Sequence, residues 1–205
     1  MITRRLSRTD YTTTWRAMQQ FTDARDPGTA DELWLTEHPP IYTLGLAGRR
    51  EHVLRDNGIP VAKVDRGGQV TYHGPGQLVA YTLVDLRRGR LSIREMVRRL
   101  ERAVIEWLAT HRIAAYGKPS APGVYVDRAG SEAKIAALGL KVRNHCTYHG
   151  LAVNVAMDLA PFERIDPCGY AGLRTVDLRS LGVEMEWDDA AARLAAALAR
   201  HLEPR

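Results

Sequence analysis

The sequence predicts an α+β fold in one domain, and three observations support this class. Apolar residues at helical spacing follow polar capping residues early, midway and late in the chain. The strand-like apolar runs lie in groups between these helices, whereas a parallel α/β sheet requires strands and helices that alternate. The 205 residues contain no internal repeat and no convincing linker, so residues 1–205 are expected to form a single domain.

The first half of the chain is expected to begin with an amphipathic helix. Its apolar residues recur at helical spacing after Asp10, and the sequence Asp26-Pro27-Gly28 ends it. A short helix is expected at residues 51–57, because Gly58 suits the left-handed position that often follows a helix. The strands expected in this half are residues 32–37, 41–44, 59–64 and 78–86.

The second half contains the clearest helical pattern of the chain. Ser92 and Glu95 have the spacing of a capping box, and an apolar stripe continues from them to about His111. A last helix, rich in alanine and leucine, is expected to be capped near Asp188 and to reach Leu202. The strands expected between these helices are residues 122–126 and 134–142, which form a hairpin, and residues 147–157.

The stretch from Arg66 to Gln77 lies between two expected strands and is unusually polar. Four glycines and a proline in its twelve residues exclude a helix and predict a tight, shaped connection. Gly67-Gly68 lets a ligand or another segment approach the main-chain N–H groups closely. Arg66 and His73 add a fixed positive charge and a titratable imidazole. An ordinary β-hairpin is the alternative, but the six polar side chains exceed what a turn needs.

Composition and charge are those of an ordinary globular protein. Hydrophobic residues make up 45% of the chain and charged residues 26%. The formal charge of +5 suggests an acidic partner, although an arginine-rich, solvated helix surface explains much of it. The N-terminus lacks the apolar core of a signal peptide, and no apolar run approaches membrane-spanning length. A cytoplasmic location without a membrane partner is therefore expected.

The chain has two cysteines, Cys146 and Cys168, and no C-x-x-C pair. Cys168 lies between a proline and a glycine in a polar loop, which is not where a core residue is expected. Cys146 stands at the entrance of a strand, where a packed and inert thiol is expected. A nucleophilic cysteine needs a neighbouring cation or base, because a free thiol with a pKa of about 8.5 is only slightly ionised at neutral pH.

Lys134 is one candidate for that neighbour, and His73 and His149 are the alternative bases. Lys134 lies in an apolar run, where desolvation lowers a lysine pKa and a thiolate partner keeps the amine charged. A lysine that packs its stem and extends its amine to solvent is the simpler alternative. No metal site is expected, because His145 and His149 would lie about 13 Å apart on an extended strand.

Several motifs together resemble those of the bacterial octanoyltransferases of lipoate biosynthesis, also called lipoyl(octanoyl) transferases. The match covers most of the chain, and the motifs occur in one order. They are residues 37–40 (EHPP), 66–77 (RGGQVTYHGPGQ), 121–126 (APGVYV), 134–142 (KIAALGLKV), 149–154 (HGLAVN) and 167–169 (PCG). The resemblance implies an α+β fold with a mixed, mostly antiparallel sheet and packing helices, as in the catalytic domain of biotin and lipoate protein ligases.

The resemblance also implies an activity, namely transfer of an octanoyl group from octanoyl-acyl carrier protein to a lysine of lipoyl domains. The implied acceptors belong to the 2-oxoacid dehydrogenase complexes and to the glycine cleavage H protein. Cys168 would carry the acyl group as a thioester intermediate, Lys134 would activate it, and no cofactor is expected. The implied substrate pocket consists of Arg66, Gly67, Gly68, Gln69, Val70, Thr71, Tyr72, His73, Ala137, Leu138, Gly139, Gly150, Leu151 and Ala152.

Three alternatives compete with this interpretation. An ATP-dependent lipoate or biotin protein ligase on the same fold needs no cysteine, and its lysine usually lies in a Lys-Ile-Ser-Gly-like stretch from which residues 134–137 depart. A basic nucleic-acid-binding protein is supported only by the net charge, so no nucleic acid partner is expected. A non-catalytic binder of acylated domains is disfavoured because both Cys168 and Lys134 are present.

Overall fold

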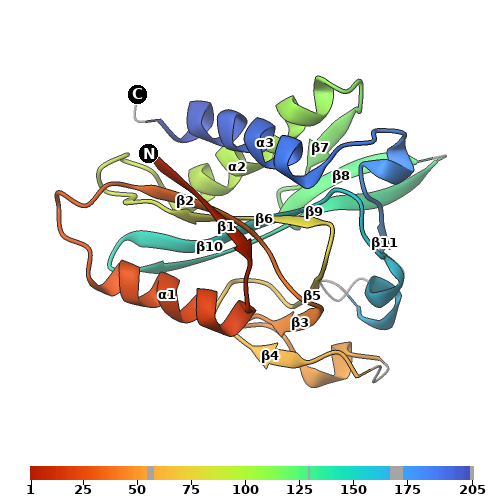
Figure 1. Ribbon diagram of the computed structural model, residues 1–205, viewed down its shortest axis with the longest axis horizontal. Coiled ribbons are helices and arrows are strands. Elements are labelled where there is room, and N and C mark those ends of the chain that lie inside the picture. The colour runs from red at the N-terminus through yellow and green to blue at the C-terminus, as the bar shows by residue number, and fades with distance from the viewer. Residues whose placement is uncertain (55–57, 129, 167–172, 204–205) are drawn as a thin grey trace.

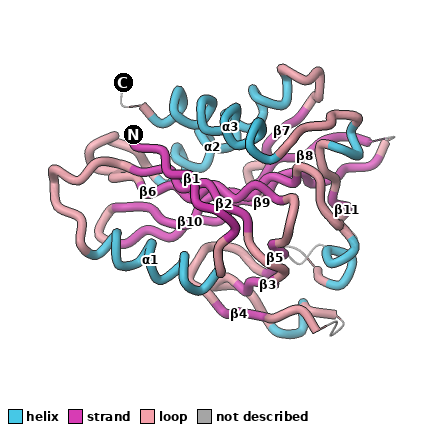
Figure 2. Tube along the Cα trace, viewed as in Figure 1, coloured by secondary structure: helices cyan, strands magenta, loops and turns pink. Residues whose placement is uncertain are grey.

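The computed structural model describes residues 1–54, 58–128, 130–166 and 173–203. A large sheet forms the middle layer of the molecule (Figure 1). Helices α2 (Ile93–Ala109) and α3 (Trp187–Leu202) cover one face of this sheet, and α1 (Tyr11–Asp23) lies on the other face together with a small second sheet. Figure 2 shows the same arrangement, with the strands between the two helical layers.

The large sheet is mixed and mostly antiparallel, as expected. Two pairs within the described residues are parallel, namely β1 with β2 and the short β11 (Arg174–Thr175) with β9, and the other pairs are antiparallel. In spatial order its strands are β1 (Ile2–Arg8), β2 (Glu32–Glu37), β6 (Gln77–Leu83), β10 (Cys146–Asn154), β9 (Ser131–Arg143), β8 (Gly123–Arg128) and β7 (Ala115–Gly117).

The small sheet lies below the large one and contains part of the glycine-rich stretch. Its central strand is β3 (Ile41–Leu44), which pairs in parallel with β4 (Val61–Lys63) and antiparallel with β5 (Val70–His73). Side chains from β3 and β5 pack with the 3₁₀ turn η2 (Ala160–Arg164) in a core of their own. The glycine-rich stretch is therefore held by strand pairing over its middle residues, 70–73.

The alternation of side chains along β6 explains how both faces of the large sheet become covered. Leu78 and Ala80 belong to the main core, under α2 and α3. Val79 and Tyr81 point to the opposite face, where they form a second core with Met18 of α1. A central strand that is apolar on both faces must be buried on both, and the residues of β6 are all buried.

The expected helices α1 and α2 are confirmed with their caps. The Asp10 carboxylate accepts a hydrogen bond from the Thr13 N–H at 2.8 Å, and the Ser92 hydroxyl accepts one from the Glu95 N–H at 3.2 Å. The strands at 32–37 and 41–44 and the β8–β9 hairpin are confirmed as well.

Three expectations differ from the structure. In place of a helix at residues 51–57, a 3₁₀ turn spans Arg50–His52, and Val53 then bridges to Ile165 of a distant segment; residues 55–57 lie outside the described part. The last helix begins at Trp187 after Glu186, with no side-chain cap. The connection at residues 66–77 contains a strand, β5, because its partner β3 supplies the hydrogen bonds that a local pattern does not reveal.

No helix within the described residues is both long and apolar enough to span a lipid bilayer.

Candidate functional site

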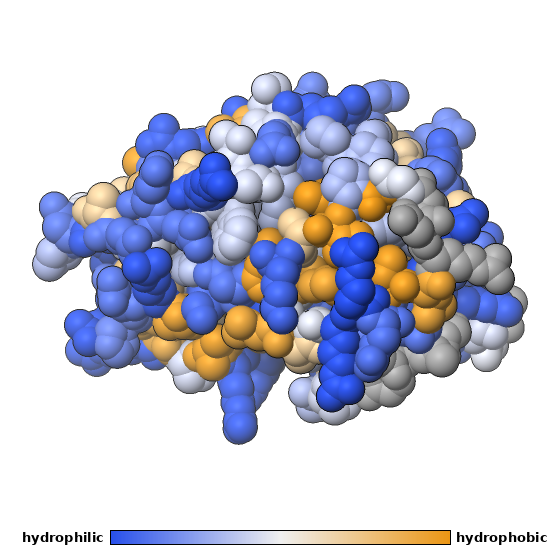
Figure 3. Space-filling model, turned by 90° about the horizontal axis from the view of Figure 1, so that it is seen from below, coloured by the Kyte–Doolittle hydropathy of each residue, from blue (hydrophilic) through white to orange (hydrophobic). Residues whose placement is uncertain are grey.

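A cavity lies on the face of the large sheet that α2 and α3 leave uncovered. Its walls come from β6, β9 and β10 of the large sheet, from β5 of the small sheet, and from Tyr11 and Phe162. The surface on this side of the molecule carries an apolar patch that is crossed by long hydrophilic side chains (Figure 3). An apolar recess with a few polar groups is the usual form of a site for a small molecule or an acyl chain.

Most residues of the expected substrate pocket line this cavity. Gly67 and Tyr72 do not line it. The Tyr72 ring packs instead against the Phe162 ring, with 5.4 Å between the ring centroids, in the core of the small sheet. Lys134 also lines the cavity. The expected pocket residues found in the wall are Arg66, Gly68, Gln69, Val70, Thr71, His73, Ala137, Leu138, Gly139, Gly150, Leu151 and Ala152.

Glycines let the polar stretch lie directly on the large sheet. The Gly67 N–H donates a hydrogen bond to the Leu140 carbonyl at 2.9 Å, and a Cβ on Gly139 would lie only 2.7 Å from the Gly67 oxygen. Gly139 pairs with Gly150 across β9 and β10. Any larger residue at Gly139 would push the two backbones apart, so the sequence pattern found here serves a close approach between chain segments.

Arg66 holds the glycine-rich stretch in shape. Its guanidinium donates to the carbonyls of Thr43, Gly67 and Gln69 at 2.6, 3.0 and 2.9 Å. These contacts use the rigid fork of donors that only arginine provides. The positive charge expected from the sequence is thus present in the cavity wall, buried and bonded to main-chain oxygens.

Lys134 is buried in the wall of the cavity, with 4% of its surface exposed. Its Nζ donates to the Pro122 carbonyl at 3.5 Å and lies 5.0 Å from the centroid of the Tyr125 ring. The alternative that this lysine extends its amine into solvent is therefore wrong. A buried amine over an aromatic face is a site where a nearby negative group is strongly stabilised.

A chain of buried side-chain hydrogen bonds connects the cavity wall to Val176, the residue that follows β11. His73 donates from Nδ1 to Gln77 Oε1 at 2.7 Å, and Gln77 donates to Asn154 Oδ1 at 3.0 Å. Asn154 in turn donates to the Val176 carbonyl at 3.0 Å. Burial lowers the pKa of His73 to about 3, so this imidazole is neutral at physiological pH.

His149, the other candidate base, is paired with Asp65. Its Nε2 donates to Asp65 at 2.9 Å, its Nδ1 is buried with no partner among the described residues, and its φ of 61° lies in the left-handed region. Burial opposes ionisation of Asp65, yet hydrogen bonds from His149 and Tyr148 outweigh it and lower the pKa of Asp65. His149 pairs with Leu140, six residues beyond Lys134 on β9, which corresponds to about 20 Å. It is too distant to act beside Lys134.

Cys146 is a packed residue, as expected. It lies at the start of β10 and is 6% exposed, and burial raises the pKa of its thiol. It pairs with Arg143, nine residues beyond Lys134 on β9, or about 30 Å away. Cys146 therefore cannot share a site with Lys134.

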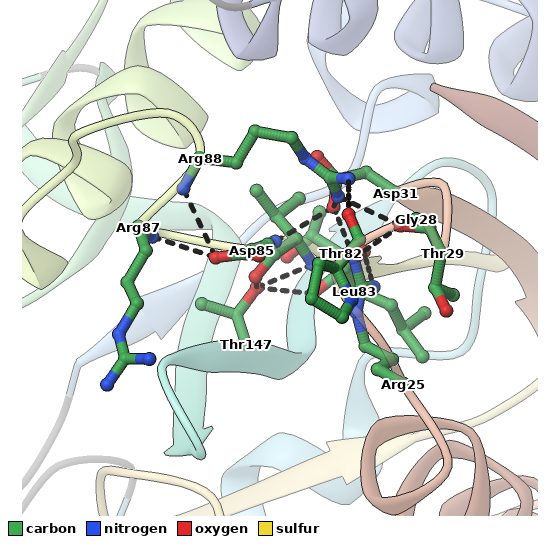
Figure 4. Close-up of polar contacts among 12 residues, drawn as sticks. Arg25, Gly28, Thr29, Asp31, Thr82, Leu83, Asp85, Arg87, Arg88 and Thr147 are labelled. Atoms are coloured by element: carbon green, nitrogen blue, oxygen red, sulfur yellow. Dashed lines mark hydrogen bonds and ion pairs between the residues drawn. The ribbon is translucent and has the colours of Figure 1, made fainter.

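Cys146 lies at the end of the sheet where β6 ends and β10 begins, and charged side chains stabilise this end (Figure 4). Asp31 accepts from both Arg25 and Arg88 at 2.6 Å and from the Asp85 N–H at 2.8 Å. Thr147 donates to the Thr82 carbonyl at 2.7 Å in the same group. These contacts tie the loop after α1 to the ends of β6 and β10, which is a structural role.

Cys168 lies outside the described residues. The described residues on either side of its segment, Asp166 and Leu173, both line a second cavity, together with Thr175 and Phe162. Thr175 and Phe162 also line the first cavity. Thr175 is paired with Lys134 across β11 and β9, and the Val176 N–H donates to the Lys134 carbonyl at 3.0 Å.

Several wall residues were not expected from the sequence. Tyr11 and Tyr81 come from elements that show only core periodicity, and Tyr81 donates its hydroxyl to His38 Nε2 at 2.6 Å. Asn154 is conspicuous in the sequence as an amide within an apolar strand. The remaining unexpected wall residues are Val79, Phe162 and Thr175, and His149 was considered only as a base. No group of three or more His, Cys, Asp or Glu in the described ranges is placed to hold a metal ion.

Comparison with known proteins gives the family of this chain. Residues 10–199 match the model of the lipoyl protein ligase A/B catalytic domain. The chain belongs to this family. An octanoyltransferase from Chromobacterium violaceum is 56% identical over 98% of this chain and 95% of its own length, and one from Burkholderia pseudomallei is 57% identical over 97% and 89%. The resemblance drawn from the motifs is therefore confirmed.

Solved structures of the lipoyl protein ligase family share the fold. A bipartite lipoate protein ligase from Thermoplasma acidophilum superposes with a TM-score of 0.79 at 19% identity, covering 98% of this chain and 84% of that chain. A biotin protein ligase from Aquifex aeolicus, in complex with biotin and ATP, gives 0.59 at 13% identity, covering 98% and 70%. The expected relation to the catalytic domain of biotin and lipoate ligases is confirmed for the fold.

Proposed function

We propose that the chain transfers an octanoyl group from octanoyl-acyl carrier protein to a lysine side chain of a lipoyl domain, with Cys168 as the intermediate acyl acceptor. Relatives that are 56–57% identical over nearly the whole chain are octanoyltransferases, which supports this activity. The structural observation that carries the proposal is the buried Lys134 in the wall of an apolar cavity. The segment with Cys168 continues directly into the strand that pairs with Lys134.

In the first half of the reaction, the Cys168 thiolate attacks the carbonyl carbon of the carrier thioester. A new C–S bond forms, the bond to the carrier sulfur breaks, and the departing thiolate takes a proton from the Lys134 ammonium. One thioester replaces another, so this step is nearly neutral in free energy. Main-chain N–H groups of the glycine-rich segments would bind the tetrahedral oxyanion, although the Gly67 N–H is already donated to Leu140.

In the second half, the neutral amine of the acceptor lysine attacks the Cys168 thioester. A C–N bond forms, Cys168 leaves as a thiolate, and the surplus proton of the amine passes to Lys134, which becomes an ammonium again. Conversion of a thioester to an amide runs downhill. Dividing the transfer in this way lets two protein substrates use one site in turn.

The cavity supplies the selection of chain length. Burial of each CH₂ contributes about 0.8 kcal/mol, which changes binding only about fourfold per carbon. Discrimination must therefore come from a closed end, where a longer chain meets fixed atoms. Ala137, Gly139 and Ala152 offer the small side chains that leave room for an acyl chain along β9 and β10.

The test is mass spectrometry of the protein after mixing with octanoyl-acyl carrier protein, followed by addition of a lipoyl domain. We expect an octanoyl adduct that maps to Cys168 and disappears when the acceptor is added. Cys168→Ser should abolish transfer, while Cys146→Ser, the matched control, should retain most of it because that thiol is packed about 30 Å from Lys134. An adduct on Cys146, or transfer by Cys168→Ser, would overturn the assignment.

A ligase activity is the second candidate, because lipoate and biotin ligases share the fold. Incubation with ATP and free octanoate separates the two functions. Formation of octanoyl-adenylate would favour the ligase, whereas the proposed transferase uses only the thioester donor. The proposed donor and acceptors belong to the cytoplasm, which is the location we infer for this chain.

A further inference from the structure

Glu101 of α2 carries a buried carboxyl group that the mechanism above leaves unused. It is 9% exposed, because it lies among the buried residues of the helix face that covers the main core. Its Oε1 accepts a hydrogen bond from the Gly123 N–H at 3.0 Å, and its Oε2 would be 2.9 Å from a Cβ on Gly117. A carboxyl group is rarely buried in this way unless a positive group compensates it.

Gly123 is the point at which Glu101 and Lys134 come together. A Cβ on Gly123 would lie 2.9 Å from Lys134 Cε and 3.2 Å from Nζ, while the N–H of the same residue is donated to Glu101. The φ of Gly123 is 145°, a conformation that favours glycine. The lysine amine and the carboxyl group therefore lie against one residue that has no side chain to separate them.

The electrostatics of Glu101 agree with this placement. Burial raises the pKa of Glu101, whereas the Gly123 hydrogen bond and the positive charge of Lys134 act against that rise. The Glu101 carboxylate and a positive charge on Lys134 therefore attract one another.

The other charged groups around Lys134 are less suited to this task. Glu132 interacts with Lys134 but is only partly buried, and it is paired with Lys118 at 2.8 Å. Lys118 lies 5.0 Å from the Tyr125 ring, the same distance as Lys134, and its positive charge opposes a second ammonium there. Among the described groups that face Lys134, Glu101 is the buried anion.

We propose that Glu101 is a positioning residue for acyl transfer, which holds the Lys134 side chain beside the cavity as an ammonium. This inference rests on the proposed function, in which Lys134 gives up a proton in the first half-reaction and recovers it in the second. A buried ammonium is stabilised when a carboxylate lies close by, because the two opposite charges compensate each other. Glu101 thereby stabilises the ammonium that the second half-reaction regenerates, so that it is in place when the next donor binds.

The test uses NMR titration of the lysine side chains, which does not depend on activity. The sequence contains only four lysines, Lys63, Lys118, Lys134 and Lys141, so ¹³C-lysine labelling gives few signals, and Lys134→Arg identifies the relevant one. Glu101→Gln keeps the acceptor for the Gly123 N–H but removes the charge. We expect the titration midpoint of Lys134 to fall by about one pH unit or more, as for loss of a nearby opposite charge.

Two controls make the result decisive. Glu132→Gln removes an equal charge from a partly exposed site, and we expect a much smaller shift of the Lys134 midpoint. The reciprocal measurement is the titration of the Glu101 carboxyl group in wild type and in Lys134→Gln. We expect its midpoint to be higher in Lys134→Gln, by a similar number of pH units. This measurement decides the question if Glu101→Gln does not fold. Equal Lys134 midpoints in wild type and Glu101→Gln, or an unmoved Glu101 midpoint, would overturn the inference. A wild-type protein that transfers no octanoyl group would instead contradict the proposed function, whatever the titrations show.

Discussion

His73 is a histidine whose ordinary titration is suppressed by its place in the fold. The ring is buried, stacks on Tyr11 at 5.4 Å, and donates its Nδ1 proton to Gln77. Burial lowers its pKa from 6.5 to about 3. Burial also lowers the pKa of His149, the other histidine in the cavity wall, and that of His38, which contacts the wall residue Tyr81.

This neutrality predicts how stability depends on pH. Between pH 6.5 and about 3 the unfolded chain binds a proton at His73 that the folded chain excludes. The free energy of unfolding should therefore fall as the pH is lowered through this window, by up to about 1.4 kcal/mol per pH unit for each such histidine. His73→Asn keeps a donor toward Gln77. It should reduce the slope of unfolding free energy against pH by the amount that corresponds to about one bound proton. Urea unfolding between pH 7 and pH 4.5 measures both slopes, and identical slopes would contradict the argument.

At the residue scale, the sequence indicates which side chains line the cavity but not how buried or ionised they are. Arg66, His73 and Lys134 all lie in the cavity wall, and they are conspicuous in the sequence because they stand beside glycines or within an apolar run. The enclosure of Lys134 depends on Tyr125 of the paired strand β8, and the neutrality of His73 depends on burial beside Tyr11, which comes from a distant part of the chain. Burial of a titratable group is a property of its neighbours, so a local pattern cannot supply it.

At the scale of elements, Asn154 links three strands that meet at the cavity. It lies at the end of β10, accepts from Gln77 at the start of β6, and donates to Val176, which follows β11. Because β11 has only two residues, the Asn154 bond is an important part of what keeps it beside Lys134.

Asn154→Ala should therefore loosen β11 as well as destabilise the fold. The substitution leaves the Gln77 amide and the Val176 carbonyl buried without this partner, which costs about 1–3 kcal/mol of unfolding free energy. We expect faster amide hydrogen exchange at Val176 and a reduced rate of octanoyl transfer. Thermal unfolding and hydrogen exchange measure the two effects. Asn154→Asp retains the acceptor for Gln77 but loses the donor, so slow exchange at Val176 in that variant would argue against the role assigned to the donor.

The elements that the sequence predicted are those with local causes. Asp10 and Ser92 cap their helices through their own side chains, and the β8–β9 hairpin has its turn in adjacent residues. The strands β1, β5, β7 and β11 were not predicted. β1 is an edge strand rich in exposed arginine, and β11 exists only because β9 offers it a parallel partner. Short or polar strands are defined by their partners, so their own sequence carries little signal.

At the scale of the whole molecule, the cavity exists because two sheets of different size lie on each other. The order of elements predicted the α+β class, but not that residues 66–73 would cross over Gly139. The family match over residues 10–199 and the shared fold of ligases show that this arrangement supports more than one chemistry. What distinguishes the chemistries is the site and the partners that reach it.

The net charge of +5 bears on those partners. If the octanoyl donor is presented by an acidic carrier protein, attraction between the two proteins speeds their encounter, and salt screens that attraction. Raising NaCl from about 50 mM to about 500 mM should lower kcat/KM for the carrier-bound donor at least about fivefold, mainly through KM.

Octanoyl-pantetheine, which has the same reactive thioester but no carrier protein, provides the matched control for this effect. Its kcat/KM should change little with salt, because the chemical step takes place in a cavity that is shielded from bulk ions. Equal salt dependence for both donors would mean that the charge of the chain acts on the site itself and not on docking. A dependence confined to the carrier-bound donor would locate the role of the arginine-rich surface in the encounter between the two proteins, where the charge of the whole molecule and not any single residue decides the rate.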